Sequence, residues 1–265
     1  MKRFLQFANL ATLLFTIWVN YYTNTQQVGV SMKAISDQYL NLFTPAGYAF
    51  SIWGVIYVAL LAFSVYQLLD VFTPKVNNDF VLKIGGWFIL ANLANAAWVV
   101  AFINNHVGLS VLIMAVLFAA LLKIVLNLNM ERWDAPFVTI AFIWWPVSAY
   151  FGWINVAAMA NVSAWLTSLG WTGAPFSPTF WAVTMLLIAT LIFITMIWKR
   201  NMREYATAAV WGIVAIGVKN ANSNDIVAYT AYAVAVVIII NTMVHGYQNR
   251  ALGPIRRFRP KPPVI

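Results

Sequence analysis

TPAGYAFSIWGVIYVALLAFSVYQLL, residues 44–69, is an apolar stretch without a single charged residue. About 20 predominantly apolar residues in a helix cross the hydrocarbon core of a bilayer, so a membrane-spanning helix is expected over residues 47–69. Comparable stretches lie on both sides of it, at residues 4–22, 83–103, 108–127, 136–161, 178–198 and 225–246, with a shorter one at 205–219. The sequence therefore predicts an all-α, polytopic membrane bundle of about eight transmembrane helices.

The composition supports a membrane protein and restricts its chemistry. Hydrophobic residues make up 62% of the chain and charged residues 9%, against about 45–50% and 25% in soluble domains. Because the chain has no cysteine, disulfides, thiolate metal sites, covalent haem attachment and a cysteine nucleophile are all excluded.

The net charge of +9 is explained by how basic residues are distributed between the two sides of the membrane. With eight crossings, one side carries Lys2, Arg3, Lys75, Lys83, Lys123, Arg132, Lys199, Arg200, Arg203, Arg250, Arg256, Arg257, Arg259 and Lys261. The other side carries only Lys33 and Lys219. Since basic residues accumulate on the cytoplasmic side, we expect an inner-membrane protein with both termini in the cytoplasm. The charge then needs no nucleic-acid partner.

The outer loop, residues 23–44, is long for a link between membrane helices. Within it Met32, Ile35, Tyr39 and Leu42 recur at helical spacing, and Ser31 is placed to cap the start of a short amphipathic helix. Two interpretations remain open: a lid over the outer mouth of the bundle, or a helix that rests on lipid headgroups.

Aromatic and amide residues from three predicted helices fall at one depth in the outer half of the membrane, if each residue rises about 1.5 Å. The set comprises Trp53, Tyr57, Asn95, Trp98, Tyr150, Trp153 and Asn161. Such a cluster could bind a flat hydrophobic ligand. It could equally be an interfacial aromatic belt, with the amides joining helices.

The same residues carry a resemblance to a known family. Residues 44–57 resemble the Pro-Pro-x-Trp-Val-Phe-Gly-Pro-Val-Trp-Thr-x-x-Tyr motif of the TspO/translocator protein family, the tryptophan-rich sensory proteins. Residues 95–102 are similar to its Asn-x-x-Trp-x-x-x-Phe motif. Residues 150–161 are similar to Tyr-x-x-Trp-x-x-Phe-Ala-x-x-x-Asn, with Val156 in place of the phenylalanine.

The resemblance implies a five-helix core over residues 1–165, whose cavity beneath the first loop binds porphyrins and other hydrophobic ligands such as sterols. The chain departs from the family pattern at four positions, which puts the shape of the pocket in doubt. Those positions are Thr44, Gly47, Ser51 and Ala149. Residues 166–249 would be a three-helix extension, which short members of the family lack. Residues 250–265 form a basic, proline-rich cytoplasmic tail that could anchor to anionic headgroups or to a partner subunit.

Several other chemistries are disfavoured. Acidic residues fall at the ends of the predicted spans or between them, which argues against ion-coupled transport. His106 and His245 are expected at opposite sides of the membrane and cannot ligate one haem. We therefore predict no metal site, no catalytic residue and no cofactor apart from a porphyrin bound as a ligand. Photodegradation of that porphyrin at Trp53 and Trp153 remains a hypothesis.

The leading hypothesis is thus a membrane sensor, carrier or scavenger that binds a tetrapyrrole at the seven-residue set. The alternative is a structural or assembly subunit of a membrane complex with no ligand of its own. The expected partners are a hydrophobic small molecule and membrane lipids. A homodimer or a larger complex could form through the C-terminal helices and tail.

Overall fold

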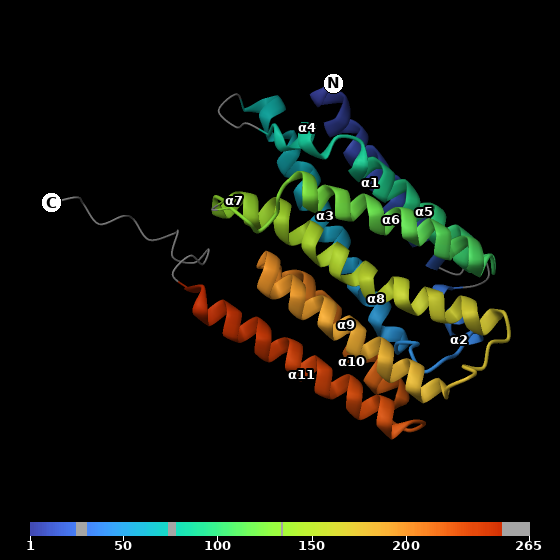
Figure 1. Cartoon of the computed structure of the whole chain (residues 1–265). Coiled ribbons are helices and arrows are strands. Elements are labelled where there is room, and N and C mark those ends of the chain that lie inside the picture. The colour runs from blue at the N-terminus through green and yellow to red at the C-terminus, as the bar shows by residue number, and fades with distance from the viewer. Residues whose placement is uncertain (25–30, 74–77, 134, 251–265) are drawn as a thin grey trace.

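The computed structural model describes residues 1–24, 31–73, 78–133 and 135–250, which form a helical bundle (Figure 1). Its eight long helices, counted over these residues, are α1 (Lys2–Asn24), α3 (Ile52–Phe72), α5 (Trp87–Ile103), α6 (Val107–Asn127), α8 (Trp145–Ser168), α9 (Pro178–Arg200), α10 (Arg203–Asn220) and α11 (Asp225–Gln248). Shorter helical segments are α2 (Met32–Gln38), the 3₁₀ turn η1 (Gly47–Ser51), α4 (Phe80–Ile84), α7 (Phe137–Thr139) and the π-helical turn η2 (Ile140–Trp144). The predicted polytopic helical bundle is confirmed.

Six helices of the described residues are long and apolar enough to cross a membrane. They cover Lys2–Thr23, Gly47–Phe72, Val107–Asn127, Phe137–Ser168, Pro178–Arg200 and Asp225–Gln248. The other two long helices, α5 and α10, differ from these for separate reasons. Helix α5 has only 17 residues, because the predicted segment 83–103 breaks at Gly85, whose φ of +58° ends α4.

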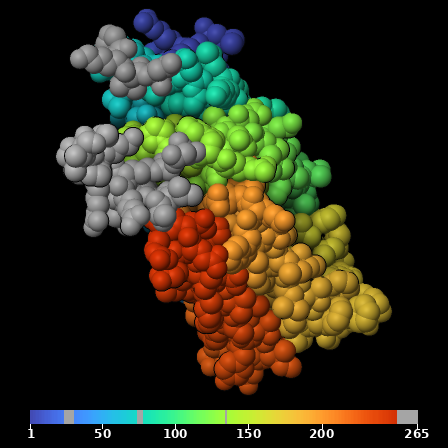
Figure 2. Space-filling model, turned by 60° about the vertical axis from the view of Figure 1, so that its left-hand side comes forward, coloured from blue at the N-terminus to red at the C-terminus, as the bar shows by residue number. Residues whose placement is uncertain are grey.

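Helix α10 has 18 residues, or about 27 Å of length at 1.5 Å per residue. It carries three charged residues, Arg203, Glu204 and Lys219, whereas each of the six has an 18-residue stretch with at most two. It packs against α8, α9 and α11. A helix surrounded by other helices presents little surface to lipid, so it does not need the uniform hydrophobicity of a lipid-facing span. Figure 2 shows the orange part of the C-terminal helices packed against the green part of the chain, with the red helix beside the orange part.

The outer loop contains the predicted amphipathic helix in a shorter form. Helix α2 begins after Ser31, whose Oγ accepts a hydrogen bond from the Ala34 amide at 3.2 Å, and Met32 and Ile35 are buried as predicted. The helix ends at Gln38, so Tyr39 is its C-cap and Leu42 lies beyond it. Residues 25–30 of the loop and 251–265 of the tail lie outside the described residues.

Helix α1 carries a buried polar stripe that the sequence analysis did not identify. Asn9 donates to Gln67 Oε1 at 2.9 Å, and Thr16 donates to the carbonyl of Asn92 at 2.8 Å. Asn20 donates to Asn95 Oδ1 at 3.1 Å. Hydrogen bonds between helices satisfy polar groups that lipid cannot, so α1 is fixed against α3 and α5 along its length.

Helices α8 and α10 approach most closely at Gly152. A Cβ atom added there would lie 2.0 Å from the carbonyl oxygen of Tyr205 and 3.0 Å from its Cα. Backbone atoms cannot move aside as a flexible side chain can, so this contact requires glycine. The absence of a side chain on α8 thereby sets the distance between the two helices.

We predict that Gly152→Ala forces α8 and α10 apart and lowers the free energy of unfolding by about 1–3 kcal/mol. The measurement is thermal unfolding of the full chain in detergent. Gly54→Ala is the matched control, because a Cβ on Gly54 meets no atom within 4 Å and alanine favours the helix by up to about 1 kcal/mol. Equal melting temperatures for the two variants would contradict the close contact.

Candidate functional site

Trp53, at the start of α3, lies at the centre of the aromatic cluster. Its ring centroid is 5.5 Å from that of Tyr57 and 5.9 Å from that of Tyr150. The corresponding distances are 6.2 Å to Trp98 and 6.3 Å to Trp153. These separations and the mixture of stacked and edge-to-face angles are typical of favourable aromatic packing. Helices α3, α5 and α8 thus bring the five predicted aromatic residues into one cluster.

Asn95 on α5 bridges four helices. Its Nδ2 donates to the hydroxyl oxygen of Tyr150 on α8 at 2.8 Å. Its Oδ1 accepts hydrogen bonds from Asn20 Nδ2 on α1 and, at 3.4 Å, from the Tyr57 hydroxyl on α3. Because the amide is fully buried, these bonds hold both of its polar atoms in one orientation. Asn20 was missed from the sequence, although its place on the polar stripe of α1 is a usable signal.

Asn161 on α8 makes a second bridge. Its Oδ1 accepts from Trp98 Nε1 at 2.8 Å, and its Nδ2 donates to Ser110 Oγ at 2.8 Å. Ser110 belongs to α6 and is also buried, so the bond network joins α5, α6 and α8. Sequence analysis missed Ser110 because a single serine in an apolar helix usually bonds to its own backbone, which Ser110 also does at the carbonyl of Val107.

Two indole nitrogens in the cluster remain without partners. Trp53 is 5% exposed and Trp153 is 2% exposed, yet neither Nε1 atom has a hydrogen-bond acceptor among the described residues. An unsatisfied buried donor costs about 1–3 kcal/mol. The cluster therefore contains two buried N–H groups able to donate to an acceptor from outside the chain.

The free space at the cluster is small. A cavity of about 40 Å³ lies between Trp98, Trp153, Phe50 and Asn161. One water molecule occupies about 30 Å³ in the liquid, so this cavity is far too small for a tetrapyrrole. The resemblance implied a ligand-binding cavity beneath the first loop, whereas here the aromatic rings pack around Trp53 and leave little free space beside them.

The C-terminal half of α10 holds the segment that covers the cluster, Met32–Ser51, which we call the covering segment. It does so through four polar contacts spaced along the helix. The contacts are Trp211 Nε1 to the carbonyl of Ala49 at 3.1 Å, the Ala46 amide to the carbonyl of Ala215 at 2.9 Å, Asn220 Nδ2 to the carbonyl of Leu42 at 3.0 Å, and the ion pair of Lys219 with Asp37 at 2.9 Å. The residues from α2 to η1 therefore depend on α10 for their position.

Gly47, one of the departures from the family motif, has a structural reason. A Cβ atom on Gly47 would lie 2.7 Å from Cε and 2.9 Å from Cδ of Lys33. The methylene stem of Lys33 thus covers the position at which the family motif has a tryptophan. The Lys33 ammonium also forms an ion pair with Asp37 at 2.6 Å.

The cluster offers packing and hydrogen-bonding chemistry. Among residues 1–24, 31–73, 78–133 and 135–250, no group of three or more His, Asp or Glu residues could hold a metal ion. His106 is the N-cap of α6. His245, near the end of α11, is buried edge-to-face against Trp198 at 5.2 Å. The two histidines thus lie at opposite ends of their helices, consistent with their predicted separation.

Comparison with known proteins identifies a family. A family model described as TSPO-like protein matches residues 6–244. The matched range begins in α1 and ends in α11, so it includes most of residues 166–249, the segment expected to be an extension. No curated protein and no solved structure matches the chain.

The attachment of α2 is expected to depend on pH. The hydrogen bond from Lys33 holds the pKa of the Asp37 carboxyl below its ordinary value, and Lys219 acts in the same direction. A lowered pKa in the folded protein means that the stabilisation is present at neutral pH and is lost as the pH falls through that pKa. The chain has no cysteine of its own, so the Ala34→Cys variant carries a single site for a spin label on α2. That label should therefore become more mobile below about pH 4.

The control for this experiment is Asp37→Asn in the A34C background. It should give a mobile label at every pH, because the amide cannot form either ion pair. If the label mobility depended on pH in the same way in the Asp37→Asn variant and in the Ala34→Cys parent, the ion pairs would not be what holds α2 in place.

Proposed function

Because the chain belongs to the TSPO-like protein family, we propose that this multi-pass membrane protein binds a flat hydrophobic ligand, a tetrapyrrole, at the aromatic cluster. Binding of this kind suits a sensor, a carrier or a scavenger. The observation that carries the proposal is the pair of buried indole N–H groups of Trp53 and Trp153, which have no acceptor among the described residues.

The chemistry of a tetrapyrrole complements this pair. Its carboxylate groups would accept hydrogen bonds from the indole nitrogens and remove the cost of two unsatisfied donors. Its planar ring would stack on the faces of Trp53, Trp98 or Trp153. The amides of Asn95 and Asn161 have their partners within the chain, so in this proposal they fix the walls of the site rather than contact the ligand.

Entry of such a ligand requires the cluster to open. The cavity of about 40 Å³ must enlarge, which means that Trp53 has to separate from its neighbours. The covering segment is the part best suited to move, because its described contacts with α10 include a few single hydrogen bonds and one ion pair. Movement of α2 would expose Met32 and Ile35, which a hydrophobic ligand could cover in turn.

The rival function is that of a structural or assembly subunit, and one observation favours it. The rings already pack at distances of 5.5–6.3 Å around Trp53, and both amides are bonded within the chain. On this proposal the cluster is a helix-packing core, and the protein acts through a homodimer or a larger complex formed by its C-terminal helices and tail.

We further infer an inner-membrane location with both termini in the cytoplasm. Lys2, Arg200 and Arg203 lie at helix ends on one side of the bundle. That side, shared by α4 and α7, is opposite to α2 in Figure 1. The outer side holds Lys33 and Lys219, both paired with Asp37. The asymmetry of positive charge supports this orientation.

The test is a titration of the detergent-purified chain with protoporphyrin, followed by tryptophan fluorescence. We expect saturable quenching, with affinity weakened about tenfold in the Trp53→Phe, Trp153→Phe double variant, because phenylalanine keeps an aromatic face but removes the N–H donor together with part of the ring area. Trp18→Phe is the matched control, since Trp18 is 56% exposed and packs only with Phe15 and Tyr22 among the described rings. Its affinity should equal that of the parent.

Two outcomes would favour the structural rival. One is quenching that increases linearly with protoporphyrin and never saturates. The other is saturable quenching with an affinity that the double variant leaves unchanged, because the ligand would then bind away from the two indoles.

A further inference from the structure

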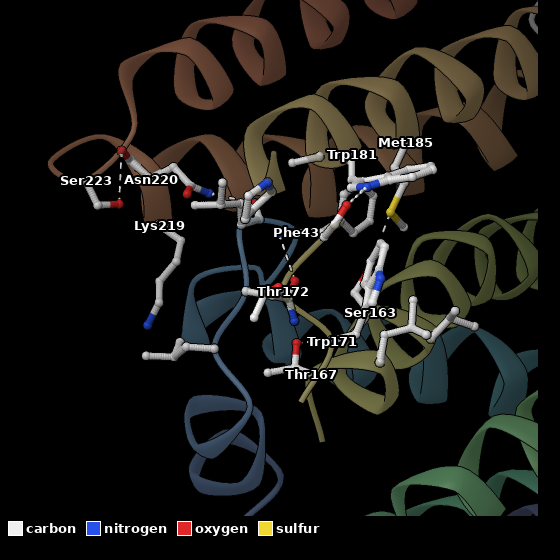
Figure 3. A pocket seen from close by; sticks show the side chains of 18 residues that line it. Phe43, Ser163, Thr167, Trp171, Thr172, Trp181, Met185, Lys219, Asn220 and Ser223 are labelled. Carbon is white, nitrogen blue, oxygen red and sulfur yellow. Dashed lines mark hydrogen bonds between the residues drawn. The ribbon is translucent and has the colours of Figure 1, made fainter. Parts of the chain in front are cut away.

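A second and much larger cavity, of about 780 Å³, lies outside the aromatic cluster. It is an open pocket bordered by the end of α8, the link to α9, the first two turns of α9, residues 40–43 of the outer loop and the end of α10 (Figure 3). It shares no lining residue with the seven-residue set or with the 40 Å³ cavity. Its volume is in the range of about 300–1,000 Å³ that holds small ligands.

The walls of this cavity are apolar and well fixed. Leu166 from α8, Trp181 and Met185 from α9, Trp171 from the link and Phe43 from the outer loop line it. Trp171 and Trp181 lie 5.5 Å apart, and Trp181 Nε1 donates to the carbonyl of Gly173 at 2.6 Å. The polar atom of Trp181 is therefore bonded, and its ring is left as a wall for a hydrophobic ligand.

One end of the cavity carries a positive charge. Lys219, at the end of α10, lines it, and the side chain is 33% exposed. Both Lys219 and Lys33 pair with the single carboxylate of Asp37. Two positive charges thus share one negative charge, which leaves one positive charge for a monoanionic group to neutralise.

The polar and apolar parts are arranged along the membrane normal. Lys219, Asn220 and Ser223 lie at the outer end, near the helix terminus. The α9 side of the cavity runs inward from Pro178 to Met185, a depth of about 10 Å at 1.5 Å per residue. A ligand that fills this space needs a charged head at the outer surface and an apolar chain pointing into the membrane.

We propose that this cavity binds a long-chain fatty acid, with its carboxylate at Lys219 and its chain between α8 and α9. A single carboxylate matches the one unneutralised positive charge, and the surrounding membrane is a ready source of such a molecule. Carboxylate and ammonium groups form charge-assisted hydrogen bonds, which are stronger than neutral ones. The site is independent of tetrapyrrole binding at Trp53 and Trp153.

The experiment measures equilibrium binding of radiolabelled palmitate to the full chain in detergent. We expect saturable binding of one palmitate per chain, weakened about tenfold by Lys219→Gln. Lys199→Gln is the matched control, because it removes a positive charge from the exposed far end of α9, which does not line the cavity and does not pair with Asp37. Its affinity should stay within about threefold of the parent, a change expected from a more distant charge.

Three further experiments test the acyl chain, the head group and the position of the bound ligand. Val162→Trp should place a large ring inside the cavity and weaken binding, whereas Leu191→Trp adds the same ring at a 67% exposed position of α9 that does not line it. Methyl palmitate, which has no charge, should bind about as weakly as palmitate binds to the Lys219→Gln variant. A photoreactive palmitate on the parent chain should label Leu166, Trp181 or Met185, a result that does not depend on any variant folding correctly.

The proposal is overturned if palmitate and its methyl ester bind equally, or if Lys199→Gln weakens binding as much as Lys219→Gln. Photolabelling confined to outward-facing positions such as Leu191 would also overturn it. Failure to bind palmitate together with saturable binding of phosphatidylglycerol would show a two-chain lipid to be the occupant and reject the fatty acid.

Discussion

The close approach of α8 and α10 at Gly152 is the contact on which the rest of the structure depends. Because glycine lets the backbone of Tyr205 lie against α8, α10 runs directly beside the helix that carries Tyr150, Trp153 and Asn161. Further along α10, Gly212 leaves room for the ring of Trp153, which a Cβ atom would meet at 3.2 Å. From that position the C-terminal half of α10 contacts the covering segment. Two glycines on two helices thus set the geometry of both the cluster and its cover.

Within the bundle, amides and indoles satisfy different requirements. An amide buried among apolar helices needs partners for two kinds of polar atom, and Asn95 and Asn161 find them on neighbouring helices. Each therefore stabilises a particular helix arrangement. An indole has one donor on a large apolar ring, so it can be packed well and still lack an acceptor. Trp53 and Trp153 are in that condition, which explains why the same cluster can be read as a packed core and as a ligand site.

Sequence patterns predicted those features that depend on local chemistry. The apolar lengths of the long helices, the cap at Ser31 and the common level of Trp53, Trp98 and Trp153 all follow from periodicity and spacing. Features that depend on tertiary neighbours were missed. The sequence did not indicate the central place of α10, because its hydropathy is modest. Hydropathy reflects exposure to lipid, and α10 is largely covered by other helices. The break at Gly85 and the end of α2 before Leu42 depend on backbone angles that the apolar pattern does not encode.

The cavity of about 780 Å³ could not be predicted for the same reason, since it arises from the way five segments meet. Consecutive helices in a membrane bundle are commonly neighbours, and a direct α8–α9 pair would leave no space between them. Here α9 packs chiefly against α11 and α10, and α8 packs against α10 and α6. Helices α8 and α9 therefore make few direct contacts with each other, and Trp171 and Trp181 line the gap instead of filling it. The second cavity lies where the ends of α8 and α10 and the start of α9 meet residues 40–43, so its shape depends on contacts between segments that are far apart in the sequence.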